Sequence, residues 1–66
     1  MNYVKNKGIF VGTFNDRDIA LGVDKVAVRK MQAVTGYNYT NSFLVKRNGN
    51  VIGIRLYVCS KEDFAI

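Results

Sequence analysis

The chain has 66 residues, of which 48% are hydrophobic, and its ten Lys and Arg exceed its five Asp and Glu to give a formal charge of +5. This length allows one domain with a thin core, and the apolar content excludes intrinsic disorder. The single cysteine, Cys59, and the absence of histidine exclude a disulfide framework within the chain and the usual Cys/His zinc site. A buried thiol in a reducing, cytoplasmic compartment is therefore expected.

Residues 2–14 predict β structure that begins with a short apolar piece at Tyr3 and Val4. A turn at residues 6–8 leads to a strand over residues 9–14, which is rich in β-branched and aromatic side chains. Gly12 inside that strand predicts a bulge or a close backbone contact. The lysines inside this stretch exclude a signal peptide or a membrane span, and no membrane partner is expected.

Two helices follow the strand. Asn15 with Asp18 predicts a capping box and a helix of about six residues before Gly22. A second helix is predicted from Asp24, as its N-cap, to about Thr35, because no Pro or Gly interrupts this stretch. At ~100° per residue the helix has two faces. The core face is Ala27, Val28, Met31 and Val34, and the opposite face is Lys25, Arg29 and Gln32.

Residues 37–41 predict a connecting loop, and residues 42–58 predict a hairpin whose turn is Asn48-Gly49, since both residues tolerate positive φ angles. Pairing Arg47 with Asn50 places Lys46 opposite Val51, Val45 opposite Ile52, and Phe43 opposite Ile54. The alternation then predicts a core face of Phe43, Val45, Ile52, Ile54, Leu56 and Val58. The same alternation predicts a solvated face of Lys46, Arg55 and Tyr57.

The tail contains Ser60 with Asp63 three residues later, which predicts a final helical turn. Phe64 and Ile66 are expected to cover the open side of the core, unless the tail frays. Together these elements predict one α+β domain over residues 1–66. It consists of an N-terminal strand or hairpin, a helix-turn-helix pair, and a C-terminal β-hairpin packed on the second helix.

The sequence offers little for enzyme chemistry. General acid-base work would fall to five carboxylates, and four of these lie where helix N-termini are predicted. The two serines, Ser42 and Ser60, have no base beside them in sequence, and no phosphate-binding loop is present. We therefore expect a binding protein with no catalytic residues, no metal and no cofactor.

The segment Gly22–Met31, GVDKVAVRKM, resembles the turn and recognition helix of helix-turn-helix proteins, whose common form is Gly-Val-Ser/Asp-x-x-Thr/Ala-Val-x-x-Leu. The preceding GIFVGTF strand followed by DIALGV is similar to nuclease-associated modular DNA-binding domains of homing endonucleases and small phage proteins. The basic hairpin and the SKEDF tail resemble phage excisionases, where a winged-helix domain uses its hairpin on DNA. The resemblance spans residues 9–36 most clearly.

This resemblance implies a DNA surface on the second helix at Lys25, Val26, Arg29 and Lys30, with Val28 and Met31 in the core. Arg29 has the donors to read a guanine edge, and lysines suit phosphates. The remaining candidates, on the helix, the hairpin tip and its second strand, are Gln32, Lys46, Arg47, Asn48 and Arg55. The expected function is a small phage-type regulator or architectural protein that binds double-stranded DNA and acts as a homodimer.

Two other interpretations remain open. The basic charge and the aromatic content also suit a non-enzymatic protein-binding inhibitor or modulator, such as a phage anti-defence or host-takeover factor, docked on an acidic protein surface. RNA binding through the sheet is a third, with Tyr57 as the stacking ring on the outward face of the hairpin. The remaining alternative is that the basic helix face and the hairpin tip are exposed to solvent and bind no partner.

Overall fold

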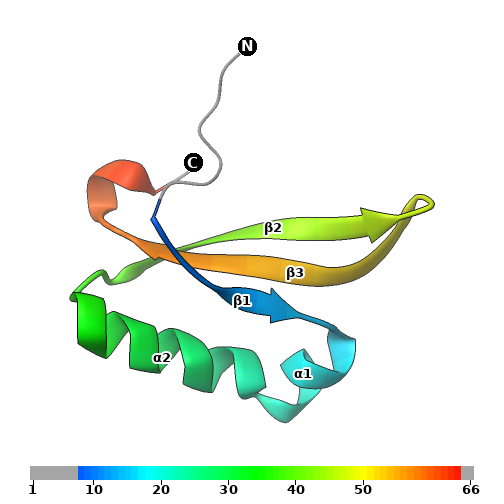
Figure 1. Ribbon diagram of the computed structural model, residues 1–66, viewed down its shortest axis with the longest axis horizontal. Helices are drawn as coiled ribbons and strands as arrows, with labels where there is room; N and C mark the ends of the chain where they lie inside the picture. The colour runs from blue at the N-terminus through cyan, green and yellow to red at the C-terminus, as the bar shows by residue number, and fades with distance from the viewer. Residues whose placement is uncertain (1–7, 65–66) are drawn as a thin grey trace.

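The computed structural model describes residues 8–64, which form a small α+β fold (Figure 1). In chain order the elements are β1 (Ile9–Phe14), α1 (Asp16–Leu21), α2 (Val23–Thr35), β2 (Tyr39–Arg47), β3 (Asn50–Cys59) and the 3-10 turn η1 (Lys61–Asp63). The strands make a three-stranded antiparallel sheet in the order β1-β3-β2. The predicted class and order of elements are confirmed. The first predicted strand, at Tyr3 and Val4, lies outside the described residues. The same is true of Ile66.

Strand β1 has the predicted bounds and contains the predicted irregularity. Phe10 pairs with Tyr57 and Gly12 with Leu56, so Val11 is the extra residue of a bulge. A Cβ at Gly12 would lie 3.0 Å from the ring of Phe14, which is only 8% exposed. Glycine at this position therefore leaves room for the one well-buried side chain described on β1.

Helix α1 begins with the predicted capping box. Asn15 Oδ1 accepts a hydrogen bond from the Asp18 N–H at 2.9 Å, and Asp18 Oδ2 accepts one from the Asn15 N–H at 3.2 Å. The helix ends at Gly22, whose φ of 78° is left-handed. Gly22 is therefore both the C-cap of α1 and the N-cap of α2.

Helix α2 starts at Val23 with Gly22 as its N-cap, so the prediction of Asp24 as the N-cap is wrong. The physical reason is that one left-handed glycine joins the two helices, which leaves no separate capping position before the new helix. Asp24 instead lies in the first turn with a buried side chain. The C-terminal end is as predicted: Gly36 is left-handed and its N–H donates to the Gln32 carbonyl at 2.8 Å.

The buried side of α2 is rotated from the predicted one. Val28 and Met31 are partly buried as predicted, whereas Val34 is 82% exposed, so its assignment to the core is wrong. Asp24 and Thr35 lie on the inner side instead, and Thr35 Oγ1 donates to the Met31 carbonyl at 2.7 Å. The rotation follows from packing: α2 contacts β1 and β3 through the side that carries Asp24, Val28 and Met31, and Val34 lies outside that side.

The hairpin turn is confirmed, because Asn48 and Gly49 have φ angles of 52° and 81°. Strand β2 starts at Tyr39, so the prediction of a loop over all of residues 37–41 is wrong for its last three residues. The predicted register is right next to the turn, where Lys46 faces Val51. Beyond it a bulge at Ile52 shifts the pairing, so the structure has these partners: Val45 with Gly53, Leu44 with Ile54, and Phe43 with Arg55.

This bulge changes which side chains share a face, because a one-residue shift exchanges the two sides of a strand. On the helix side lie Thr40, Ser42, Leu44, Lys46, Ile54, Leu56 and Val58. On the other side lie Asn41, Phe43, Val45, Arg55, Tyr57 and Cys59. The predicted core positions of Ile54, Leu56 and Val58 are confirmed, whereas Phe43 and Val45 were predicted on the wrong side. The predicted core position of Ile52 is also wrong, because this bulge residue is 46% exposed.

The face away from the helices has its own aromatic packing, so its prediction as a solvated surface is wrong for Tyr57. Arg55 is exposed there as predicted, and Lys46, predicted on this face, lies on the helix side. The ring of Tyr57, 8% exposed, lies 5.3 Å from that of Phe10 and 5.8 Å from that of Phe43. At one end of this face η1 folds back, and Asn41 Nδ2 donates to the Asp63 carbonyl at 3.2 Å. The ring of Phe64 lies 5.3 Å from that of Tyr39, and both residues are exposed, so this contact does not give Phe64 the predicted role of covering the core.

Candidate nucleic-acid interface

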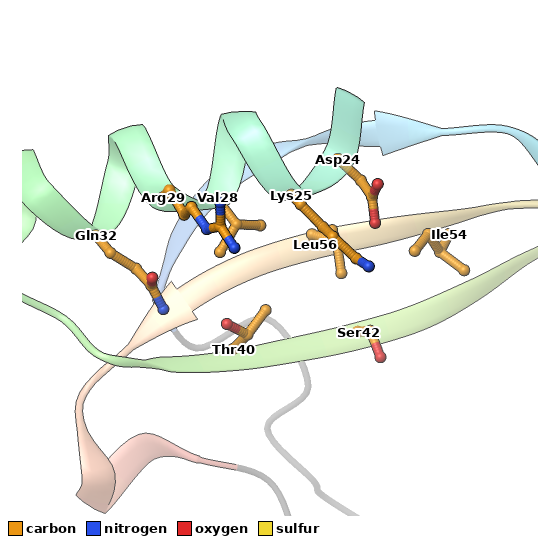
Figure 2. Close-up of a pocket in the computed structure, with 9 residues that line it drawn as sticks. All are labelled: Asp24, Lys25, Val28, Arg29, Gln32, Thr40, Ser42, Ile54 and Leu56. Carbon is orange, nitrogen blue, oxygen red and sulfur yellow. The ribbon is translucent and has the colours of Figure 1, made fainter. Parts of the chain in front are cut away.

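Helix α2 packs on β1 and β3 and leaves the edge strand β2 uncovered (Figure 1). An open groove therefore runs between α2 and the hairpin (Figure 2). The groove has a volume of about 390 Å³. It is lined by Asp24, Lys25, Val28, Arg29, Gln32, Thr40, Ser42, Ile54 and Leu56. The basic face predicted for the second helix therefore borders a hollow of the molecule.

The basic rim of this groove comes from one side of α2. Lys25 and Arg29 are exposed and extend from the helix over the strands in Figure 2. Gln32, one turn further on, is partly buried, and its Nε2 donates to the Asn38 carbonyl at 3.4 Å. The spacing of three to four residues places all three on the same side of the helix.

Val26 and Lys30 lie further round the helix, away from the groove. Val26 is 59% exposed, and Lys30 borders a second, smaller hollow together with Val11 and Met31. The structure therefore spreads the five candidate residues of α2 over its outer surface, with Lys25 and Lys30 on opposite flanks.

The hairpin candidates divide between two sides of the sheet. Lys46 lies on the helix side, the side onto which the groove opens. Arg47 and Asn48 are exposed at the tip, which projects past α1 at the end of the molecule where α2 begins (Figure 1). Arg55 is exposed on the opposite face, paired across the sheet with Thr13. The structure does not bring Arg55 together with the residues of α2.

The exposed basic side chains of α2, and Lys46 of β2, have no acidic partner among residues 8–64. In the described range 8–64, no carboxylate lies within ion-pair distance of Lys25, Arg29, Lys30 or Lys46. Their charge is therefore available to an external anion, and an exposed cation of this kind neutralises phosphate well.

One acidic residue in the groove was missed as a candidate site residue. Asp24 is 8% exposed, and its Oδ1 is buried with no hydrogen-bond partner in the part of the chain that the structure describes. A buried acceptor left unpaired costs about 1–3 kcal/mol. The sequence pattern was misleading, because an aspartate shortly after a glycine is also typical of the N-cap of a helix.

The apolar strip is a second feature that the sequence did not indicate. We use this name for Leu21, Val23, Val26 and Val34, which are 70%, 44%, 59% and 82% exposed. These residues lie at the end of α1 and along the outer side of α2. An exposed apolar surface on a small protein is typical of a contact site.

Other chemistry has little support among the described residues. They contain no group of three or more His, Cys, Asp or Glu that could hold a metal ion. Burial raises the pKa of the Cys59 thiol, and the negative charge of Asp63 adds to the rise. This thiol is fully buried and protonated at neutral pH. No helix in the described part of the chain has the length and apolar character to cross a membrane.

The joint between α1 and α2 is shorter than the turn of a helix-turn-helix motif. A single residue, Gly22, connects them, whereas a helix-turn-helix uses a turn of about 3–4 residues. Comparison of the chain with protein-family models, with characterised proteins and with solved structures finds no significant match. What the chain binds is therefore inferred from the charges and contacts of this surface.

Proposed function

We propose that this chain is a small DNA-binding protein that lays the outer side of α2 against the sugar-phosphate backbone and adds a second contact through the hairpin. The observation that carries the proposal is the placement of Lys25, Arg29 and Lys46. All three border the same open side of the molecule, and the two on α2 are exposed without an acidic partner among residues 8–64.

The charge of the whole chain supports the same proposal. A formal charge of +5 on 66 residues attracts a polyanion and raises the rate of encounter. Phosphate contacts alone give affinity with little sequence preference. The outer side of α2 also offers Arg29, whose paired donors can read a guanine edge where the helix enters a major groove.

The test is a salt titration of binding to a labelled DNA duplex, followed by fluorescence anisotropy. The K25A/R29A double variant should weaken binding and lower the slope of log affinity against log salt by about 2, one for each lost phosphate contact. The matched control is Arg55→Ala, which removes the same kind of charge from the opposite face of the sheet and should leave the slope nearly unchanged.

Two results would overturn the proposal. One is the absence of duplex binding at low salt. The other is an equal loss of affinity in Arg55→Ala and in K25A/R29A, since equal loss would mean that net charge matters and the α2 surface does not.

The apolar strip favours a second candidate function, a modulator that docks on an acidic protein. The strip supplies apolar contact, and Lys30 beside Val26 and Ala27 supplies charge. A partner recovered from nuclease-treated host lysate should be lost with Val34→Lys and retained with K25A/R29A. Recovery that depends on nucleic acid would remove this candidate.

A further inference from the structure

The groove between α2 and the hairpin has an apolar floor beneath a basic rim. Val28 of α2 and Ile54 and Leu56 of β3 form the floor, and Thr40 of β2 lies on the side wall (Figure 2). A volume of about 390 Å³ is large enough for one flat aromatic ring system with room to spare. The hollow can therefore hold part of a ligand whose charged part remains at the rim.

The buried carboxylate of Asp24 indicates which chemical group the bound part of the ligand must carry. The side chain of Asp24 lines the groove, and its buried Oδ1 has no hydrogen-bond donor among the described residues. A carboxylate only accepts hydrogen bonds, so the missing partner is an N–H or O–H of a ligand. Such a ligand carries a donor at the Asp24 end and an anion near Lys25 and Arg29.

A nucleotide has both parts, an N–H on the base and a phosphate on the sugar. We propose that the groove takes one unstacked nucleobase of a single strand, a step that rests on the proposed function and adds to it. The Asp24 carboxylate accepts a hydrogen bond from the amino group of the base, and the floor contacts the face of the ring. Lys25 and Arg29 contact the flanking phosphates.

The depth of Asp24 explains why the base must leave its stack. At 8% exposure this side chain cannot be reached by a base edge inside an intact duplex. The carboxylate also selects among bases. Cytosine offers its N4 amino group, whereas uracil and thymine present a carbonyl oxygen at the same position, which repels a carboxylate oxygen. Bases with an amino group are therefore preferred.

The experiment compares two oligonucleotides of equal length, one of deoxycytidine and one of deoxyuridine. Their bases differ in that cytosine has an amino group where uracil has a carbonyl group. Fluorescence anisotropy at low salt should show that the wild-type chain binds the deoxycytidine strand about tenfold more tightly. In Asp24→Asn, which keeps the shape of the side chain, this ratio should fall to about one, because an amide also donates to the uracil carbonyl.

Arg29→Ala is the matched control, since it should weaken both strands equally and keep their ratio. A thermal melt of Asp24→Asn checks that the variant is folded. If it is not, the same ratio is measured with Ile54→Trp, which fills the floor of the groove and should also abolish the preference.

The outcomes separate this inference from the proposed function. Binding of both strands with equal affinity by the wild type overturns the base site alone, as does a preference that survives Asp24→Asn. NMR shifts at Asp24 and Leu56 on addition of an arginine-rich peptide, with none on addition of the deoxycytidine strand, would also overturn it in favour of a protein ligand. No binding of any nucleic acid at low salt overturns the proposed function itself.

Discussion

Gly53 lies where the end of β1 comes close to β3, and this close approach explains a glycine in the middle of the central strand. A Cβ on Gly53 would lie 2.6 Å from the Phe14 carbonyl oxygen, which belongs to the backbone. A side chain there would force the end of β1 away from β3. The glycine therefore reflects close backbone approach, as isolated strand glycines often do.

We expect Gly53→Ala to lower the free energy of unfolding by about 1–3 kcal/mol, measured by urea unfolding, because the backbone it meets cannot rotate away. Gly12→Ala is the matched control. Its Cβ would meet the far end of the Phe14 ring at 3.0 Å, and a side chain can shift. A loss in Gly12→Ala as large as that in Gly53→Ala would contradict this account.

Cys59 gives a prediction about pH. Burial and then the charge of Asp63 raise the pKa of its thiol above the ordinary value of 9.0. Folding therefore favours the protonated form, so the stability contribution is complete below the unfolded pKa and is lost as pH rises through the higher folded pKa.

The free energy of unfolding should accordingly fall when the pH is raised above about 9, and the fall should be smaller in Cys59→Ala. Tyrosines and lysines titrate in the same range, so the difference between the two proteins is the measurement. At neutral pH the thiol of the folded chain should resist alkylation. Identical pH profiles for the two proteins would contradict the assignment.

At the scale of the element, α2 shows that a helix can have the predicted bounds and a different buried side. Its apolar residues include partly buried Val28 and the 82% exposed Val34. Only Val28 faces the sheet, where it lines the groove between α2 and the hairpin.

The two valines form a matched pair for mutation. Val28→Ala should cost about 2 kcal/mol of unfolding free energy, because it removes packed methyl groups and leaves a gap. Val34→Ala should change it by less than about 0.5 kcal/mol. Thermal unfolding followed by circular dichroism measures both, and equal losses would mean that α2 is rotated from the described orientation.

At the scale of the whole molecule, the chain carries more positive than negative charge. The chain has ten basic and five acidic residues, and the basic groups at the groove have no acidic partner within residues 8–64. The folded state brings these cations together, so their mutual repulsion opposes folding.

Added salt should therefore stabilise the isolated chain, by on the order of 1 kcal/mol between low and physiological salt, while it weakens binding to DNA. The melting temperature across a sodium chloride series measures the first effect. Arg55→Ala, which has one fewer cation, should show a smaller rise. A melting temperature that falls with salt would indicate stabilising ion pairs instead.

The sequence by itself determined the local elements. The capping box at Asn15, the end of α2 at Gly36 and the Asn48-Gly49 turn depend on contacts between residues close along the chain. The same holds for the basic residues at Lys25 and Arg29, whose spacing alone places them on one side of a helix. These were predictable because no distant part of the molecule takes part.

Only the tertiary structure decided which faces are buried. The bulge at Ile52 exchanges the two sides of the hairpin beyond the turn, and no pattern in the sequence marked it. The placement of α2 over β1 and β3 leaves β2 open, which creates the groove and buries Asp24 in it. Both depend on how separate elements pack, because burial is a property of neighbours brought together from distant parts of the chain.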